Sequence, residues 1–371
     1  MLFIPLEKNI DWKQPPVFTI AIILINIICF FGFQMDDDED YAEAVEYYYD
    51  SGLAEIELPY YDEYLRNKNN IFSGFIKSDN TKKKSISKQK QYVLFSQMLN
   101  DGDFLKALKE DMIIKPHEEI YSKWKKRSKE FEYRVNKVTF FLHGLKAYEP
   151  TVSTLFSHMF LHANFEHLFW NMVFLFAFGF SVEMILGWRI FVPTYLLAGI
   201  GSGLFYLFIE PNSAIPGIGA SGAISGLTGM YTVLYGFRKI RFFYFVLVYF
   251  DTVKAPALTI LPIWLGYEFY NHFFIPSNIN NLAHAGGLLS GALIAWLANI
   301  FHKNMDRGYM NENNENESFA NIFSEAMLCM AALEMEKAKN KFLRLHEMQP
   351  NNIEVLRQLF NISKFKPDSN E

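Results

Sequence analysis

Long apolar runs alternate along this chain with blocks dense in Lys, Glu, Asp and Asn. Six of these runs have close to the ~20 residues that an α-helix needs to cross the hydrocarbon core of a bilayer. The runs lie at about 17–33, 165–186, 189–209, 221–237, 256–273 and 282–301. The pattern therefore predicts an all-α, polytopic membrane protein with six transmembrane helices. A further run, 242–250, is too short to span and is followed by Asp251 and Lys254, which favours an aromatic segment at the membrane interface.

Basic residues in the short connections predict the orientation of these helices. They precede the first run (Lys8, Lys13), join the second to the third (Arg189), join the fourth to the fifth (Arg238, Lys239, Arg241) and follow the last (Lys303, Arg307). Connections rich in Lys and Arg stay in the cytoplasm, so an even number of helices places both termini there. The first run has no small-residue cleavage site after it, so 1–33 is expected to be a cytoplasmic N-terminus and a retained helix.

A long polar insert, 34–150, separates the first two predicted helices. It opens with the acidic stretch that begins at Asp36 and turns basic from Lys82 onward. Long polar segments are translocated largely regardless of their charge, so we expect the insert outside the cytoplasm. The stretches 89–112 and 116–138 have helix-forming composition. The insert is interpreted as a solvated helical cap or spacer, with substrate recruitment as the alternative.

The residues after the last helix, 302–371, are expected to form a cytoplasmic linker and a small helical tail. The linker is the Asn- and Glu-rich stretch 306–318. The pattern from Ala332 to Leu343, followed by Pro350, resembles one to one and a half tetratricopeptide-like hairpins. Such a hairpin would bind a cytoplasmic protein partner, and a plain helical tail is the alternative.

The amino-acid composition argues against nucleic-acid binding and against a disulfide. Of the 371 residues, half are apolar and the net charge is only −5, so nothing points to nucleic acid as a partner. The two cysteines, Cys29 and Cys329, lie in an apolar run and in the polar tail, and they form no metal-ligand pattern. We therefore expect no disulfide between them. The Lys- and Asn-rich composition without a transit peptide favours a bacterial inner membrane.

Ser221 begins the fourth predicted helix, within the stretch Gly219-Ala220-Ser221-Gly222. Glycines beside a nucleophile permit a tight turn and leave backbone N–H groups free near the hydroxyl. Small residues in membrane helices also serve close helix packing, so this motif alone leaves both interpretations open.

His284 begins the sixth predicted helix and is followed by Gly287 and Gly291. A lone histidine in a membrane could be structural, a proton relay or a metal ligand. The fourth predicted helix has the same spacing at Gly222 and Gly226. Glycines spaced in this way in both helices allow the two to approach closely. Both helices start from outside, so Ser221 and His284 are expected at one depth and within hydrogen-bond reach.

His167 and Asn171 lie four residues apart on one face of the second predicted helix, which also starts from outside. Their side chains could stabilise the oxyanion of a tetrahedral intermediate. For Asn171, hydrogen bonding between helices is the structural alternative.

Taken together, these motifs resemble the rhomboid family of intramembrane serine proteases. The resemblance covers about 151–301 and the first helix. It rests on the following residues in this order: His158, His162, His167 and Asn171; Gly179, Glu183 and Gly187; Gly219, Ser221 and Gly222; and His284, Gly287 and Gly291.

The resemblance implies a six-helix rhomboid bundle with Ser221 as nucleophile, His284 as base and no third acidic residue. It implies no metal or organic cofactor. It implies an oxyanion hole formed by the Ser221 backbone N–H with His167 and Asn171, supported by glycine packing. Transmembrane proteins in the lipid bilayer would be the substrates, with the fifth helix as a lateral gate. The alternatives are a non-catalytic relative that binds membrane clients, and a transporter with a polar path through Ser221, His284 and Glu183.

Two features depart from the family pattern. The insert 34–150 replaces what is usually a shorter membrane-dipping loop. Many rhomboids also carry an aromatic residue four positions after the serine, packed on the histidine, where this chain has Ser225. How His284 is held is therefore open from the sequence.

Overall fold

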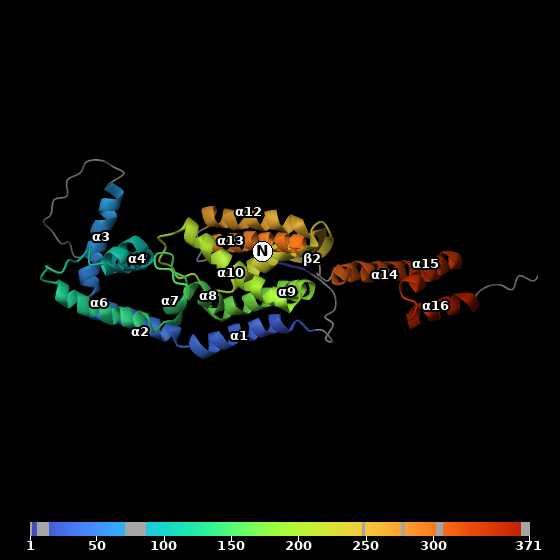
Figure 1. Cartoon of the computed structure of the whole chain (residues 1–371), viewed down its shortest axis with the longest axis horizontal. Coiled ribbons are helices and arrows are strands. Elements are labelled where there is room, and N and C mark those ends of the chain that lie inside the picture. Colours follow the sequence, from blue (N-terminus) through green and yellow to red (C-terminus); the bar gives the residue numbers. More distant parts are fainter. Residues whose placement is uncertain are drawn as a thin grey trace, which may run out of the picture. The chain divides into compact units, whose positions relative to one another are not determined.

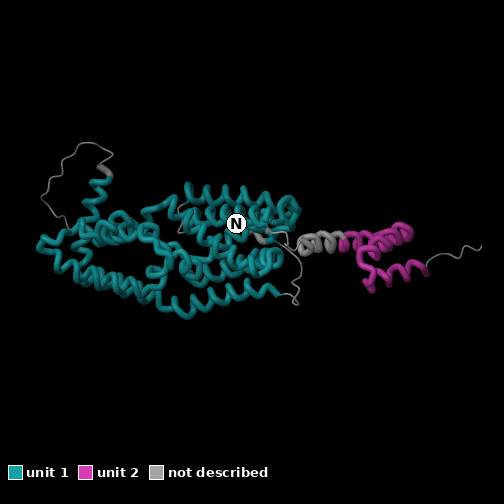
Figure 2. Tube along the Cα trace, in the orientation of Figure 1, with its two compact units in different colours: residues 1–6, 11–304 teal, residues 7–10, 305–371 magenta. Residues whose placement is uncertain are grey.

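The computed structural model describes residues 2–5, 15–70, 87–246, 249–275, 279–301 and 307–364. It divides into two compact units, Met1–Leu6 with Asp11–Asn304, and Glu7–Ile10 with Met305–Glu371 (Figure 2). The predicted basic residues Lys8, Lys13 and Lys303, and the basic stretch from Lys82, lie outside the described residues.

A helix lies at each of the six predicted runs (Figure 1). They are α1 (Val17–Phe33), α9 (Phe165–Leu186), α10 (Trp188–Ile209), α11 (Ser221–Tyr235), α12 (Ile260–Phe274) and α13 (Asn281–Phe301). Helices α9, α10 and α13 are long and apolar enough to cross a membrane. Helices α1 and α2 (Asp37–Asp50), bent by 42° relative to each other, would count as a fourth span only if the pair is taken as one. Helices α11 and α12 are shorter, with 15 residues each.

Helix α11 is the core of the bundle, because it packs on α9, α10 and α13. Its contact with α13 is made backbone against backbone. A methyl group added at Gly287 would overlap the carbonyl oxygen of Gly222, and one added at Gly291 would overlap that of Gly226. Only small residues allow membrane helices to approach this closely. The glycine spacing predicted from the sequence therefore corresponds to an actual helix contact.

Glu183 of α9 caps the start of α1. Pro16 precedes that helix and offers no side-chain cap. The Glu183 carboxylate accepts hydrogen bonds from the backbone N–H of Phe18 at 3.0 Å and of Thr19 at 2.7 Å, and from the Thr19 hydroxyl at 2.7 Å. A carboxylate satisfies the unpaired donors of a helix N-terminus and complements its dipole. These bonds account for the buried Glu183 side chain without a transport path.

A three-stranded antiparallel sheet, which the sequence analysis did not anticipate, contains the run 242–250. Its order is β1 (Leu2–Pro5), β2 (Lys239–Val246) and β3 (Tyr249–Pro256). Phe242 is fully buried, with its ring edge-on to Tyr231 of α11. Aromatic and β-branched residues favour strands, but β1 comes from a distant part of the chain that a local pattern does not reveal. The sheet lies at the end of α11 opposite Ser221, because β2 begins at Lys239, four residues after α11 ends at Tyr235.

The insert folds into helices around an aromatic core. Its helices are α2, α3 (Ala54–Asn70), α4 (Lys88–Asn100), α5 (Gly102–Lys109), α6 (Tyr121–Val135) and α7 (Thr139–His143). Tyr48, Phe104 and Trp124 are fully buried at its centre. Helices α4, α5 and α6 lie within the two predicted stretches, whereas α2 and α3 were not anticipated from their acidic sequences.

The insert is attached to the connection between α10 and α11, which leads to Ser221. Asp101 forms a β-bridge with Ser213, and Leu145 forms another with Gly217. The backbone N–H of Gly102 donates to Asn212 O at 3.1 Å. The short helices α8 (Thr154–Ser157) and η1 (His158–Phe160) complete the path from the insert to α9.

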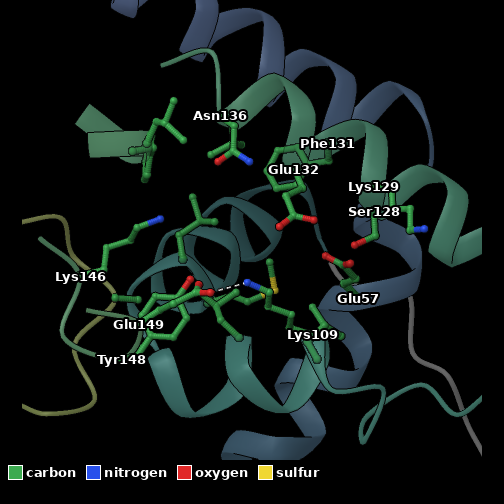
Figure 3. A pocket seen from close by; sticks show the side chains of 18 of the residues that line it. Glu57, Lys109, Ser128, Lys129, Phe131, Glu132, Asn136, Lys146, Tyr148 and Glu149 are labelled. Carbon is green, nitrogen blue, oxygen red and sulfur yellow. Dashed lines mark hydrogen bonds and ion pairs between the residues drawn. The ribbon is translucent and has the colours of Figure 1, made fainter. Parts of the chain in front are cut away.

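A cavity of about 600 Å³ is lined mainly by the insert, with Thr151, Ser153, Thr154 and Ala214 completing its wall (Figure 3). Charged residues of both signs line it, including the ion pair between Lys109 and Glu149 at 2.6 Å. Glu57 is fully buried at its wall and accepts a hydrogen bond from Trp124 Nε1 at 2.7 Å. Burial raises the pKa of Glu57 from 4.5 to about 7.

Replacing Glu57 with Gln is expected to remove a pH dependence from the stability of the insert. A raised folded-state pKa gives stability that is complete below the unfolded value and is lost as pH rises from 4.5 toward about 7. The loss is up to about 1.4 kcal/mol per pH unit, and a neutral amide does not undergo it. Urea titrations of a solubilised chain whose five other tryptophans are replaced by Phe, followed by the emission of Trp124, would measure this. Glu132→Gln, at an exposed carboxylate of the same cavity, is the matched control, and equal pH dependence in both variants would contradict the assignment.

The second unit consists of α14 (Arg307–Ala331), α15 (Met335–Met348) and α16 (Ile353–Lys364). Phe342 is fully buried in its core. The stretch predicted as a polar linker, 306–318, overlaps the first half of α14, which begins at Arg307. The stretch after Gly308 contains no proline, and a helix whose C-terminal half is packed extends readily over such residues. The likeness to a tetratricopeptide hairpin stays a prediction.

Candidate active site

Ser221 is the first residue of α11, directly after a turn that requires glycine. Gly219 has φ +117°, a conformation that residues with a side chain rarely adopt, and its N–H donates to His158 O at 2.9 Å. The first N–H groups of a helix have no partner within it and carry partial positive charge. The Ser221 hydroxyl therefore lies beside backbone donors suited to a developing anion.

His284 of α13 lies against the serine. Its Nε2 is 2.9 Å from Ser221 Oγ, within hydrogen-bond distance. The two residues are 63 positions apart in the sequence, and the contact between the glycines of α11 and α13 brings them together. This is the geometry that a serine nucleophile and its general base require. The histidine side chain is 17% exposed, so it lies in a largely dry environment that water can still reach.

Ser202 of α10 supports the turn that carries the histidine. Its hydroxyl donates to Ala283 O at 2.6 Å, one residue before His284. The same side chain fills the space beside Gly222, where a methyl group would overlap it. The sequence analysis did not single out Ser202. The signal was present as a polar residue between two glycines in an apolar run.

His167 of α9 lies beside the serine turn. A methyl group at Gly219 would be 2.9 Å from His167 Nε2 and 3.5 Å from Ser221 Oγ. His167 Nδ1 accepts a hydrogen bond from Ala163 N–H at 3.4 Å, so the proton of the neutral ring is on Nε2. That places a side-chain donor next to Ser221.

Asn171 lies one turn further along α9 and is buried. Its Nδ2 donates to His167 O at 2.9 Å, within the same helix, which leaves one amide proton for another acceptor. The structure thus brings His167 to the serine turn, while the hydrogen bond of Asn171 stays within α9.

Ser225 lies at the helix contact. A methyl group at Gly287 would be 3.1 Å from Ser225 Cβ, so this position packs against α13. The small residue is therefore matched to the close approach of α11 and α13.

Glu268 of α12 was missed by the sequence analysis. Its carboxylate is buried, and Oε2 is 3.4 Å from His284 Nδ1. Oε1 accepts a hydrogen bond from Trp264 Nε1 at 3.2 Å. An acidic residue within an apolar helix was the available signal, because such residues need a functional or structural reason. Among the residues that the structure describes, no cluster of three or more His, Cys, Asp or Glu is arranged to hold a metal ion.

Comparison with known proteins places this site in a recognised domain. Residues 149–300 match the model of the Rhomboid domain. The chain is 34% identical over 143 residues to the putative rhomboid protease YdcA of Bacillus subtilis (strain 168), covering 38% of the chain and 65% of that relative. It is 35% identical over 137 residues to the rhomboid protease GluP of the same organism, covering 36% of the chain and 24% of that relative.

Relatives are also found in eukaryotic organelles. The chain is 29% identical over 174 residues to the chloroplastic rhomboid-like protein 11 of Arabidopsis thaliana, covering 46% of the chain and 60% of that relative. In each of these three comparisons the chain spans less than two thirds of the relative's length. The matched segment contains α9 to α13 together with the serine and histidine described above. This chain is an integral membrane protein, and its residues 149–300 form a domain of the rhomboid family.

Proposed function

We propose that this chain is an intramembrane serine endopeptidase in which Ser221 is the nucleophile and His284 the general base. The observation that carries the proposal is the 2.9 Å contact between His284 Nε2 and Ser221 Oγ at the N-terminus of a buried helix. Similarity to bacterial rhomboid proteases supports it. The substrates would be membrane proteins cleaved in or near a transmembrane helix.

The reaction would proceed through an acyl-enzyme. His284 Nε2 takes the hydroxyl proton as Ser221 Oγ attacks the scissile carbonyl carbon. The oxyanion is stabilised by the Ser221 backbone N–H, by His167 Nε2–H and by the remaining amide proton of Asn171. Collapse of the intermediate breaks the C–N bond, and His284 returns the proton to the leaving amine. Water, deprotonated by the same histidine, then hydrolyses the ester to release the acid product and free serine.

The membrane arrangement is proposed as six spanning helices with both termini in the cytoplasm. Pairing of β1 with β2 supports this, because residues 2–5 lie on the same side as the basic connection after α11. Attachment of the insert to the α10–α11 connection supports an extracytoplasmic insert on the side of Ser221. We further propose a bacterial inner membrane as the location, and 302–371 as a module for a cytoplasmic partner.

Labelling with a fluorophosphonate probe, together with cleavage of a single-pass substrate in liposomes, tests the function. The wild-type chain is expected to react with the probe and to cleave, whereas Ser221→Ala does neither. Ser225→Ala, one turn along the same helix, is the control expected to keep both. A wild-type chain that binds the substrate but neither reacts nor cleaves would instead be a non-catalytic client-binding protein.

The oxyanion donors are expected to contribute unequally. His167→Ala should lower kcat by roughly a hundred- to a thousandfold, the effect of removing one such donor. Asn171→Ala should have a smaller effect, because its amide also bonds within α9. Initial rates with each variant would measure this, with Phe169→Ala on the exposed side of α9 as control. Unchanged kcat with lowered thermal stability in both variants would make these residues structural.

A further inference from the structure

Glu268 places a buried carboxylate on the far side of the His284 ring from Ser221. Its side chain is 6% exposed, and Oε2 lies 3.4 Å from His284 Nδ1. Within the described part of the chain, Oε2 has no hydrogen bond, although it is buried. A buried carboxylate oxygen without a partner is strongly unfavourable in an apolar environment. The neighbouring ring nitrogen is the group that can relieve this.

The second oxygen of the Glu268 carboxylate, Oε1, fixes the orientation of the group. Oε1 accepts from Trp264 Nε1 at 3.2 Å, one turn earlier in α12. This bond orients the carboxylate so that Oε2 faces His284. Ser221, His284 and Glu268 thus come from three helices, α11, α13 and α12. Each nitrogen of the histidine ring has a polar side chain beside it: Ser221 lies at Nε2 and Glu268 at Nδ1.

We infer that Glu268 is a positioning residue that holds His284 in the tautomer able to accept the proton of Ser221. The inference rests on the proposed function and deepens it. A neutral imidazole carries its proton on one nitrogen, and a base acting through Nε2 must carry it on Nδ1. A carboxylate beside Nδ1 favours that tautomer and stabilises the imidazolium formed when Nε2 takes the serine proton.

The arrangement also answers how the ring is held. Ser225 packs on Gly287 and is too small to cover the imidazole. Two titratable groups that interact with the histidine in the described part of the chain are Glu268 from α12 and His167 from α9. Of these, Glu268 is an acceptor suited to Nδ1–H, whereas His167 directs Nε2–H toward the serine turn. Glu268 therefore orients the base, and His167 serves the oxyanion.

Glu268→Gln is the decisive variant, because the amide keeps the size of the side chain but can present N–H groups to Nδ1. That favours the tautomer with the proton on Nε2, which cannot act as a base toward Ser221. We expect kcat to fall by on the order of a hundredfold or more, with KM within about twofold of wild type. Glu268→Asp keeps the charge and should restore part of the loss. Tyr270→Phe, an exposed position on the same helix, is the control.

A spectroscopic measurement separates positioning from stability and does not require turnover. The ¹⁵N shifts of the His284 imidazole in a Ser221→Ala background should show the Nδ1–H tautomer with Glu268 and the Nε2–H tautomer with Gln. The Nε2–H tautomer in the chain that retains Glu268 would overturn the inference, even if the Gln variant fails to fold. Active wild-type protein with normal kcat in Glu268→Gln would also overturn it while leaving the proposed function intact. An inactive wild type with the predicted tautomers would contradict the function alone.

Discussion

Ser221→Ala and His284→Ala are each expected to lower cleavage of a transmembrane substrate by at least about a thousandfold, and the double variant to lose no more than either. The reason is that, in the proposed mechanism, the nucleophile and the base act as one unit. Without the base at 2.9 Å, the hydroxyl is a weak nucleophile, and without the hydroxyl the base has nothing to activate. The residual rate in all three variants would come from substrate binding and the oxyanion donors alone.

Single-turnover rates in proteoliposomes, with enzyme in excess, would measure these losses. Ser225→Ala provides the matched control. The Ser225 side chain lies at the α11–α13 contact, and the substitution removes only its hydroxyl. Losses that multiply in the double variant would show that the two residues act separately. Substantial turnover by Ser221→Ala would remove the serine from the mechanism.

Among the substitutions proposed for this chain, Gly291→Ala is expected to cause the largest loss of stability. It should also abolish activity, although Gly291 would not touch the substrate. The added methyl group would overlap the carbonyl oxygen of Gly226, which belongs to the backbone of α11 and cannot rotate away. The helices must then separate. Overpacking typically costs about 1–3 kcal/mol, and a clash with backbone falls at or above the upper end of that range. Separation of α11 and α13 also breaks the contact of Ser221 with His284.

Gly266→Ala is the matched control for this substitution. Gly266 lies inside α12, and no atom lies within 4 Å of the position of an added methyl group. Because alanine favours a helix over glycine by up to about 1 kcal/mol, this variant should be neutral or slightly stabilised. Thermal unfolding in detergent and probe labelling of Ser221 would compare the two. Equal midpoints would show that α11 and α13 can adjust without loss.

The parts of this fold that follow from local sequence were predictable. Apolar length places helices at all six runs, since a helix that crosses a bilayer satisfies its backbone within itself. The pairing of Ser221 with His284 followed from glycine spacing and shared depth, because both are properties of single helices. The insert's helices α4 to α6 followed from composition in the same way.

The features that were missed depend on contacts between distant segments. Glu268 comes close to His284 only when α12 packs beside α13. The sequence alone therefore shows an acidic residue in an apolar helix but not the residue that it contacts. Glu183 caps a helix that lies 164 positions earlier at Thr19. Strand β1 pairs with residues more than two hundred positions later, which no local period reveals. In each case the partner is supplied by tertiary structure.

The attachments between the insert and the α10–α11 connection have a consequence for heat inactivation. The bridges of Asp101 with Ser213 and of Leu145 with Gly217 fix the chain just before the turn at Gly219. If the insert melts, these bonds are lost and the turn loses its outer support, while the glycine contact of α11 with α13 can persist. Activity should then disappear at the melting temperature of the insert, below that of the bundle. The upper temperature at which the proposed activity persists would then be set by the helices of the insert.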